Sequence, residues 1–341
     1  MGPRRCRSAA LAASGVVALA GALSRCWAQL GEGRRASLTA AGAATAVGLS
    51  QPQKVFGAPA QEIFDSVGGS EQSVVLKNGL IFPKASFGPQ AYSFNGDGKA
   101  RELTQAAVLK GYRNFFSSVD AHNQRGFAQG IQDSAIARQD LFICGSVDTK
   151  GVKGFDKAYR ETKKGCDENL QAFAAGGIDY VDMIMLDYPA ADCDSIKGQW
   201  KAFEEMLAAG KTRSLGVSNF GLTQLDCILK DPSLTPPAVN QLRYNAEAYD
   251  PATAAAIVAE NRKRGVAVQA WSPLRVSDRK KKLAEEIGKA YGKTFAQVLL
   301  RWIIQMGATY TTQSSKIDRL GENVDIFDFA LSDSDMQRLS A

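Results

Sequence analysis

Two small polar residues, Ser218 and Asn219, stand where an apolar run ends, and their hydroxyl and amide groups are suited to hydrogen-bonding a ligand. The run itself, Ser214–Val217, is predicted to be a short buried strand. In a barrel of alternating strands and helices, ligands bind at the carboxyl ends of the strands. We therefore expect Ser218 and Asn219 to face a binding site.

An amphipathic helix is predicted immediately before this strand, over Asp194–Ala209. Its apolar residues recur at the spacing that places them on one face, and they are Ile196, Trp200, Phe203, Met206 and Leu207. Gly210 is suited to end the helix, because glycine readily adopts the left-handed conformation found there. A helix followed by a buried strand is the unit from which an α/β barrel is built.

Other kinds of chemistry have few candidate residues. His122 is the only histidine, so a zinc site or a Ser-His-Asp triad would have to use it, and no GxSxG motif accompanies it. Beyond residue 60 the cysteines are Cys144, Cys166, Cys193 and Cys227, with no CxxC motif and no ligand-like spacing from a histidine. We predict free, buried thiols at these four positions and no metal site.

The charge of the chain is distributed unevenly. Of its 341 residues 45% are apolar and 22% charged, as in an ordinary soluble globular protein. Residues 1–60 contain seven basic residues and one acidic residue, which accounts for the whole formal charge of +6. The remainder is neutral, so we expect no nucleic-acid partner for the folded part.

Residues 1–60 are predicted to be a cleaved targeting leader, and residues 61–341 the folded domain. Arginines near the amino terminus precede Ser8–Leu23, an uncharged run that is short and weakly apolar for a membrane span. Arg34-Arg35 precedes a second mild apolar run, and Ala58-Pro59-Ala60 resembles a cleavage site. Two signals in series resemble the bipartite leaders of plastid proteins bound for the thylakoid lumen. The alternative is a single bacterial-type or mitochondrial leader, which would send the chain to another exported or organellar compartment.

The rest of the chain alternates strands and helices, which predicts a single (β/α)8 TIM barrel without a second domain. The predicted strands are Ser86–Gly88, Asn114–Ser117, Leu141–Gly145, Tyr180–Leu186, Ser214–Val217, Ala238–Gln241, Ala267–Ala270 and Ala308–Thr311. The predicted helices are Lys99–Leu109, Arg125–Ile136, Phe155–Ala174, Ile196–Ala208, Leu222–Leu229, Pro251–Arg264, Arg279–Ala290 and Thr294–Ile304. Ahead of the barrel, Asn78-Gly79 indicates a β-hairpin that pairs Ser73–Leu80 with Ile81–Ala85.

Several motifs, in a fixed order, resemble those of the aldo-keto reductase family of NADP-dependent oxidoreductases. They are Gly111-Tyr112-Arg113, Asp179-Tyr180-Val181-Asp182, Gly216–Phe220, Val239-Asn240-Gln241, Trp271–Leu274, Gln297–Trp302, and Arg319 with Glu322-Asn323. The resemblance extends from about Ser73 to Leu339. It implies the same barrel, with the predicted hairpin covering the barrel bottom.

The resemblance implies an NADP(H) site. Ser218, Asn219 and Gln241 match residues that hydrogen-bond the nicotinamide carboxamide, and Trp271 matches an aromatic residue that stacks on the ring. The remaining matches are Ser272 and Leu274 for the pyrophosphate, Ser314 and Arg319 for the adenosine phosphate, and Glu322 and Asn323 for adenine. The family commonly has a lysine where this chain has Gln313, so one cation is missing from the phosphate site.

The same resemblance implies altered catalysis. The family reduces carbonyls with a tyrosine as general acid, a lysine that lowers the tyrosine pKa, an aspartate that pairs with the lysine, and a histidine that orients the substrate. Gap-free matching places Phe116 at the aspartate, Ala121 at the tyrosine, Ser146 at the lysine and Asp187 at the histidine. Loss of a general acid alone typically lowers the rate of the catalysed reaction by on the order of 100- to 10,000-fold.

Neighbouring residues are candidates for a substitute acid or cation: Asp120, His122 and Lys150 lie next to the altered positions. A one-residue slip, however, turns a strand side chain to the opposite face, and the match needs no gap. We therefore predict that His122 is a loop residue.

The sequence leaves three functions open. The first is a catalytically degenerate aldo-keto-reductase-like protein in a plastid compartment, which binds a nucleotide or small molecule or serves as an accessory structural protein. Its expected partners are a small-molecule ligand or the subunits of a membrane complex, and the mature protein is expected to have no transmembrane span. The alternative is an active NADPH-dependent oxidoreductase that reduces carbonyls with a non-standard acid or base. The third is a module that binds another ligand in the altered pocket.

Overall fold

Eight parallel strands form a closed barrel in a computed structural model that describes residues 71–89 and 96–341. Around the barrel the strands follow the order β10-β3-β4-β5-β6-β7-β8-β9. Their bounds are β3 Ala85–Phe87, β4 Asn114–Ser117, β5 Phe142–Asp148, β6 Met183–Asp187, β7 Leu215–Ser218, β8 Val239–Arg243, β9 Ala267–Trp271 and β10 Thr309–Thr312. The predicted (β/α)8 barrel is confirmed.

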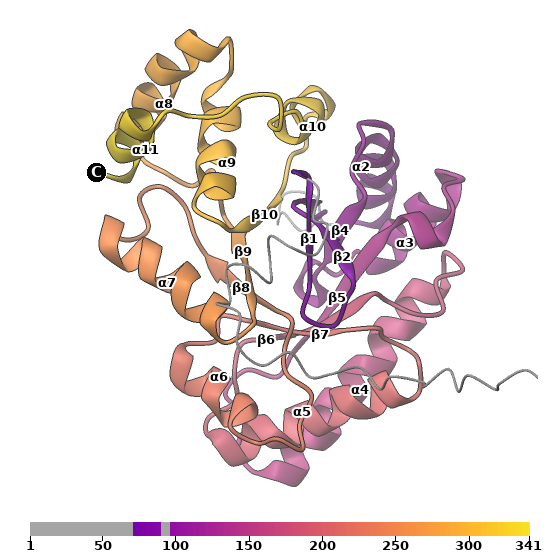
Figure 1. Ribbon diagram of the computed structural model, residues 1–341. Helices are drawn as coiled ribbons and strands as arrows, with labels where there is room; N and C mark the ends of the chain where they lie inside the picture. Colours follow the sequence, from indigo (N-terminus) through magenta and orange to yellow (C-terminus); the bar gives the residue numbers. More distant parts are fainter. Residues whose placement is uncertain (1–70, 90–95) are drawn as a thin grey trace, which may run out of the picture. The chain divides into compact units, whose positions relative to one another are not determined.

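Helices lie around the strands, as Figure 1 shows. They are α2 Asp97–Leu109, α3 Gln124–Asp133, α4 Phe155–Ala174, α5 Cys193–Ala208, α6 Leu222–Leu229, α7 Pro251–Lys263, α8 Asp278–Tyr291, α9 Phe295–Gln305, α10 Ile317–Val324 and α11 Asp333–Ser340. The bounds of α4 and α6 agree with the prediction, whereas α10 and α11 had not been predicted. Both are short and carry few apolar residues, so their sequences lack a long apolar stripe.

Side-chain caps fix where several of these helices begin. The Asp192 carboxylate accepts a hydrogen bond from the backbone N–H of Ser195 at the start of α5. Thr294 and Gln297 cap α9 reciprocally, each side chain bonding the other residue's backbone N–H. Such caps satisfy N–H groups that have no partner inside a helix.

The predicted hairpin is present and packs at the amino-terminal ends of the barrel strands. Its strands, β1 Ser73–Val75 and β2 Ile81–Pro83, pair antiparallel. Phe82 is almost fully buried and meets Phe142, the first residue of β5, ring edge to ring face with centroids 4.9 Å apart. The Asn114 amide at the start of β4 donates to the carbonyl of Pro83 over 2.8 Å. The hairpin therefore closes the end of the barrel opposite the carboxyl ends of the strands.

A buried ion-paired carboxylate also holds the strands at this end. Asp182 is fully buried and pairs with Arg138 at 2.7 Å and with Arg213 at 2.8 Å. It also accepts the backbone N–H of Ile143 over 2.9 Å. Because breaking a buried pair leaves a charge without compensation, these contacts resist separation of the connected segments. The last residue of the Asp179–Asp182 motif therefore has a structural role.

The prediction of four free thiols is wrong for two of the cysteines. Cys193 and Cys227 form a disulfide, with their Cα atoms 5.2 Å apart, while Cys144 and Cys166 are free and buried as predicted. The pairing depends on α5 and α6 lying side by side, which a sequence separation of 34 residues does not reveal.

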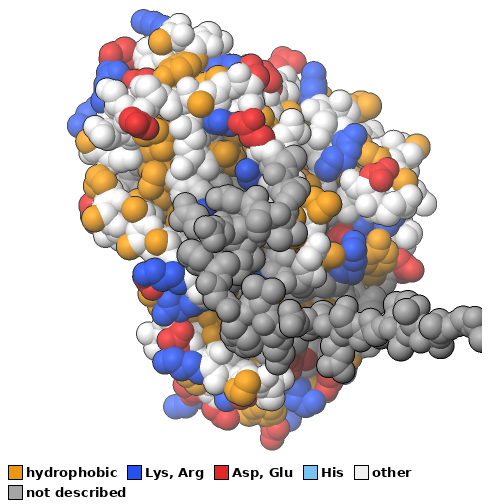
Figure 2. Space-filling view, viewed as in Figure 1, with side chains coloured by type: hydrophobic (Ala, Val, Ile, Leu, Met, Phe, Trp, Pro, Cys, Tyr) orange, Lys and Arg blue, Asp and Glu red, His pale blue; other side chains and the backbone are white. Residues whose placement is uncertain are grey.

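Charged side chains of both signs are interspersed over the described part of the face shown in Figure 2, consistent with the neutral formal charge outside the leader. Among the described residues, none of the helices is long and apolar enough to cross a membrane. The predicted leader, residues 1–60, lies outside the described part of the chain, so its role stays a prediction.

Candidate functional site

A pocket of about 620 Å³ opens at the carboxyl ends of the barrel strands. Its described lining comes from most of the strand ends and the loops after them, and includes Phe116, Ser118, Asp120, Ala121, Asp187, Tyr188, Ser218, Asn219, Gln241, Trp271, Ser272, Pro273, Leu274, Arg275, Thr311, Thr312 and Gln313. This is the end of a (β/α)8 barrel at which ligands bind. The location of Ser218 and Asn219 in the pocket agrees with the expectation from the sequence.

Strand register brings the polar groups of the pocket together. Asp187 of β6 lies opposite Ser218 of β7, and Ser218 lies opposite Gln241 of β8. The residue after β7, Asn219, adopts a left-handed φ of 62°, a conformation that asparagine tolerates better than most residues. Its backbone N–H donates to the carbonyl of Gln241 over 2.9 Å, which fixes the turn.

Asn219 is the centre of the hydrogen bonds in the pocket. Its amide nitrogen donates to the Oγ of Ser218 over 2.9 Å and to the Oδ1 of Asp187 over 3.2 Å. Its amide oxygen accepts the indole N–H of Trp271 over 3.0 Å. The ends of β6, β7 and β9 are therefore connected through one side chain. The second lone pair of the amide oxygen is the remaining acceptor that Asn219 can offer.

Gln241 is buried, and its amide nitrogen donates to the side-chain oxygen of Gln269 over 2.7 Å. This bond orients the carboxamide of Gln241, whose side chain lines the pocket. Beside Asn219, to which it donates its indole N–H, Trp271 supplies a half-buried aromatic ring to the pocket. Hydroxyl, carboxamide and indole groups of this kind fit the planar, amide-bearing ring of nicotinamide.

The loop after β9 fits the pyrophosphate part of a dinucleotide. Ser272, Leu274 and Arg275 all line the pocket, and Ser272 adopts a left-handed φ of 53°. Asn245 holds the loop by donating to the carbonyls of Ser272 and Arg275, each over 3.2 Å. Arg275, which sequence reasoning did not single out, brings a cation to this side of the pocket.

The residues matched to the adenosine end lie after β10 and on α10, outside the described lining of this pocket. The Ser314 hydroxyl bonds the backbone of Lys316 within a turn, and Arg319 and Glu322 are exposed on α10. Asn323 is buried, and its backbone carbonyl accepts the hydroxyl of Tyr310 over 2.6 Å. Arg319 and Glu322 are therefore the exposed charged groups that this segment offers.

The four positions matched to the catalytic residues lie on the same side of the barrel. Phe116, Ala121 and Asp187 line the pocket. Ser146 is fully buried, and its hydroxyl oxygen accepts the backbone N–H of Val119 over 3.2 Å, so it holds a neighbouring loop. Of these four side chains only that of Asp187 brings an ionisable group to the pocket.

Burial raises the pKa of Asp187 to about 6, although a hydrogen bond from Ser218 opposes the shift. The nearby carboxylates of Asp120 and Asp148 raise this pKa further, and a weaker bond from Asn219 lowers it. The pKa of Asp120 is also raised, first by burial and then by Asp148. This wall of the pocket is therefore acidic and poorly solvated.

The candidate substitutes His122 and Lys150 are not among the described residues that line the pocket. His122 is exposed and ends the 3-10 turn Val119–Ala121 with a left-handed φ of 50°, so it lies in a loop as expected. The Lys150 ammonium lies 4.4 Å from the centroid of the Tyr188 ring, close enough for a cation–π interaction. Asp120 is the candidate substitute that does reach the pocket.

Tyr188 is a pocket residue that sequence reasoning missed. Its ring lines the cavity beside Asp187, and its φ of 65° is unusual for a tyrosine. The residue follows the buried strand β6 directly, as Asn219 follows β7. Its place at a strand end was the signal that would have identified it.

The fold and the site together define a (β/α)8 barrel with a partly polar pocket at the carboxyl ends of its strands. The family model "Aldo/keto reductase family" matches residues 85–341, and the chain belongs to this family. It is 32% identical over 272 residues to the glyoxal reductase of Bacillus subtilis (strain 168), covering 80% of this chain and 92% of that protein.

A second relative is the morphine 6-dehydrogenase of Pseudomonas putida, 31% identical over 286 residues, covering 80% of this chain and 91% of the relative. Among solved structures, an aldo/keto reductase from Brucella melitensis superposes with a TM-score of 0.68 at 28% identity. That match covers 79% of this chain and 98% of the other. The glyoxal reductase and the morphine 6-dehydrogenase each match 80% of this chain and more than 90% of their own length, so the similarity extends over a complete domain.

Proposed function

We propose that this chain binds a nicotinamide dinucleotide, NADP(H), and that it lacks the tyrosine-based carbonyl reduction of its family. The observation that supports the proposal is the composition of the pocket. Ser218, Asn219, Gln241 and Trp271 lie together at the strand ends, as a nicotinamide ring requires. The tyrosine position of the family is Ala121, which has no proton to donate.

In this proposal the residues of the chain position the ligand. Gln241 and Asn219 hydrogen-bond the carboxamide, and Trp271 covers one face of the ring. Arg275 pairs with the pyrophosphate, and Arg319 on α10, six residues after the altered Gln313, pairs with the adenosine phosphate. A bound nicotinamide dinucleotide would supply redox capacity that these side chains lack.

The test is a titration of the full chain with NADPH, followed by tryptophan fluorescence. Stacking on Trp271 predicts saturable quenching, whereas Trp200 and Trp302 are buried in the helix layer and respond little. Trp271→Phe should remove most of the quenching, and calorimetry should show that it retains part of the affinity. Lys157→Ala, an exposed change on α4, serves as the matched control. Absence of saturable binding by both methods would exclude the dinucleotide.

The second candidate function is an active oxidoreductase with a different acid. Two observations favour it: Asp187 lines the pocket with a pKa of about 6, and Tyr188 places a phenol beside it. A carboxyl group with a pKa near neutrality is suited to proton transfer. Turnover of aldehydes or ketones with NADPH at rates ordinary for the family would favour this function. Loss of that turnover in Asp187→Asn or Tyr188→Phe would identify the acid.

We further propose that the chain works in a plastid compartment, the thylakoid lumen, on the basis of its two leader signals in series. Its partners there would be a small-molecule ligand or subunits of a membrane complex. A fluorescent protein fused to residues 1–60 tests to which compartment the leader directs the chain. Entry into plastids and cleavage to the mature size are expected, and delivery to mitochondria or secretion would favour the single-leader alternative.

A further inference from the structure

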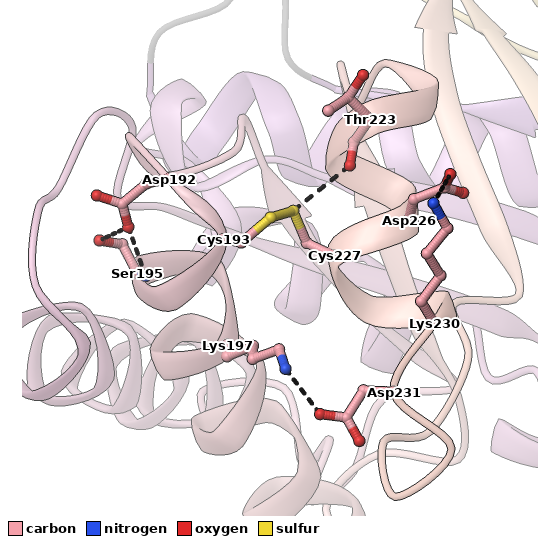
Figure 3. Close-up of a disulfide and its surroundings, with 9 residues drawn as sticks. All are labelled: Asp192, Cys193, Ser195, Lys197, Thr223, Asp226, Cys227, Lys230 and Asp231. Carbon is pink, nitrogen blue, oxygen red and sulfur yellow. Dashed lines mark hydrogen bonds and ion pairs between the residues drawn. A yellow bond between two sulfur atoms is a disulfide. The ribbon is translucent and has the colours of Figure 1, made fainter.

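The disulfide between Cys193 and Cys227 joins α5 to α6, the helices that follow the pocket strands β6 and β7. Cys193 is the first residue of α5 and is exposed, and Cys227 lies on α6 with partial exposure. Figure 3 shows the bond bridging the first turn of α5 and the body of α6. The chain between the two cysteines contains all of α5, all of β7 and most of α6.

These helices follow the two strands that hold the centre of the pocket. The loop between β6 and α5 begins at Tyr188, directly after Asp187, and it ends at Asp192 beside the disulfide. The loop between β7 and α6 begins at Asn219. The covalent bond therefore ties together two adjacent strand–helix units, and the Asn219–Asp187 hydrogen bond connects the same units inside the pocket.

Noncovalent contacts between α5 and the segment from α6 to the following loop lie further from the pocket. Lys197 and Asp231 form an ion pair at 2.8 Å, visible in Figure 3, and both side chains are partly exposed. The indole N–H of Trp200 donates to the carbonyl of Thr235 over 2.9 Å. Because exposed ion pairs contribute little to stability, the disulfide is the strongest tie near the loops.

We propose that the Cys193–Cys227 disulfide is a thiol-responsive brace, which holds the two pocket loops in their binding geometry and releases them when a dithiol reduces it. In the oxidised chain the bond limits separation of α5 from α6. In the reduced chain the two loops are connected by noncovalent contacts, among them the Asn219–Asp187 hydrogen bond and the backbone hydrogen bond from the N–H of Tyr188 to the carbonyl of Ser218. The predicted loss of ligand affinity rests on the proposed NADP(H) binding, while the loss of rigidity does not.

The chemistry needs a dithiol as the reductant. A thiolate of the dithiol attacks one sulfur of the bond, and the other cysteine leaves as a thiolate and takes up a proton. The second thiol of the reductant then displaces the first sulfur, so the products are two cysteine thiols and one oxidised dithiol. The exposure of Cys193 gives such a reagent access. A bond of this kind persists in oxidising compartments and is rare in reducing ones.

The first experiment compares the full chain with and without dithiothreitol. Peptide mapping should find Cys193 joined to Cys227 before reduction. Reduction should lower the midpoint of thermal unfolding by about 5–10 °C, since the bond closes a loop of 34 residues. Hydrogen exchange should accelerate at the loops that begin at Tyr188 and Asn219, and the dissociation constant for NADPH should rise about fivefold or more.

Two variants make the result specific. Cys193→Ser with Cys227→Ser should behave like the reduced chain and show no response to dithiothreitol. Lys197→Ala removes one of the noncovalent contacts between these segments but keeps the disulfide, so it should respond to dithiothreitol as the natural chain does.

The proposal would be overturned if mapping found both thiols free. It would also be overturned if reduction left the exchange of both loops unchanged. If neither form bound NADPH, the proposed function would fail, and hydrogen exchange would still decide for or against the brace. If NADPH bound both forms within about twofold, the brace would be excluded as a control of binding while the proposed function stood.

Discussion

Asp187 is the side chain on which the electrostatics of the pocket depend. A buried carboxylate without a cationic partner favours its neutral form, and here the pKa rises from 3.8 to about 6. Hydrogen bonds from Ser218 and Asn219 stabilise the charged form, so the site keeps a carboxylate that titrates near neutrality. The sequence match predicts that Asp187 stands where the family has a histidine, so a group that is uncharged or positive would be replaced here by one that is neutral or negative.

Replacement of Asp187 by asparagine should change the pH dependence of stability. The Asp187 carboxyl of the natural chain has a higher pKa in the folded than in the unfolded state. Its favourable contribution to the free energy of unfolding is therefore complete below about pH 4 and is lost as the pH rises through about 6. The free energy of unfolding of Asp187→Asn relative to the natural chain should therefore increase over this range, by at most about 3 kcal/mol. Urea unfolding at several pH values measures it, and a difference independent of pH would contradict the assignment.

Asn219 combines an unusual backbone conformation with the hydrogen bonds at the centre of the pocket. Asn219→Ala should cost about 1–2 kcal/mol from the left-handed φ alone, whereas Asn219→Gly tolerates that φ. Both variants lose the amide that bonds Asp187 and Trp271, so both should weaken NADPH binding by about tenfold. Calorimetry and urea unfolding separate the two effects. Equal stability of the two variants would argue against backbone strain.

At the scale of elements, the helices and strands of the barrel were largely predictable, for a physical reason. A strand buried on both faces, such as β6, is a short and mainly apolar run, and a covering helix such as α4 has turn residues at its ends. Both signals are local. The helices α10 and α11 were missed because neither has more than a few apolar positions.

The candidate site was predictable only in part. Residues that directly follow an apolar strand, such as Asn219, were identified from their position and from the family motif. The disulfide of Cys193 with Cys227 and the approach of Lys150 to Tyr188 depend on how separate elements lie side by side. No periodicity in the sequence encodes those distances. The pKa of Asp187 likewise depends on burial by several elements.

The packing of α4 against α5 gives a prediction at this scale. Gly198 is buried in α5, and a Cβ atom there would lie 2.3 Å from the backbone oxygen of Phe155, the first residue of α4. Gly198→Ala should therefore destabilise the fold by about 1–3 kcal/mol, because the backbone of α4 must move. Gly98→Ala in α2 is the matched control, since no atom lies within 4 Å of its Cβ position.

That control should stabilise α2 by about 0.5–1 kcal/mol through its higher helix propensity. Chemical unfolding of the two variants measures both effects. A Gly198→Ala chain as stable as the natural one would show that α4 and α5 are less closely packed than the structure indicates.

At the scale of the whole molecule, the barrel has two hydrophobic clusters that depend on each other. An outer cluster packs the helices on the strands, and includes Trp200, Phe203 and Trp302. An inner cluster fills the barrel between the hairpin and the pocket, and it includes Phe82 of the hairpin, Met183 and Phe116, which also lines the pocket. The barrel strands separate the two clusters, so a loss of packing in one cluster exposes the side chains of the other to solvent. The hairpin is therefore expected to unfold together with the barrel.

Truncation of the hairpin core tests this cooperativity. Phe82 is 1% exposed and contacts Phe142 inside the barrel end, whereas its neighbour Ile81 is 66% exposed. Phe82→Ala should lower the free energy of unfolding of the whole domain by about 3–5 kcal/mol, and Ile81→Ala should change it by less than about 0.5 kcal/mol. Urea unfolding followed by both far-ultraviolet dichroism and tryptophan fluorescence measures the change. With one cooperative unit, the two probes shift together and the dependence on urea keeps its slope. A separate early transition, with an unchanged main midpoint, would mean that the hairpin closes the barrel without contributing to its stability.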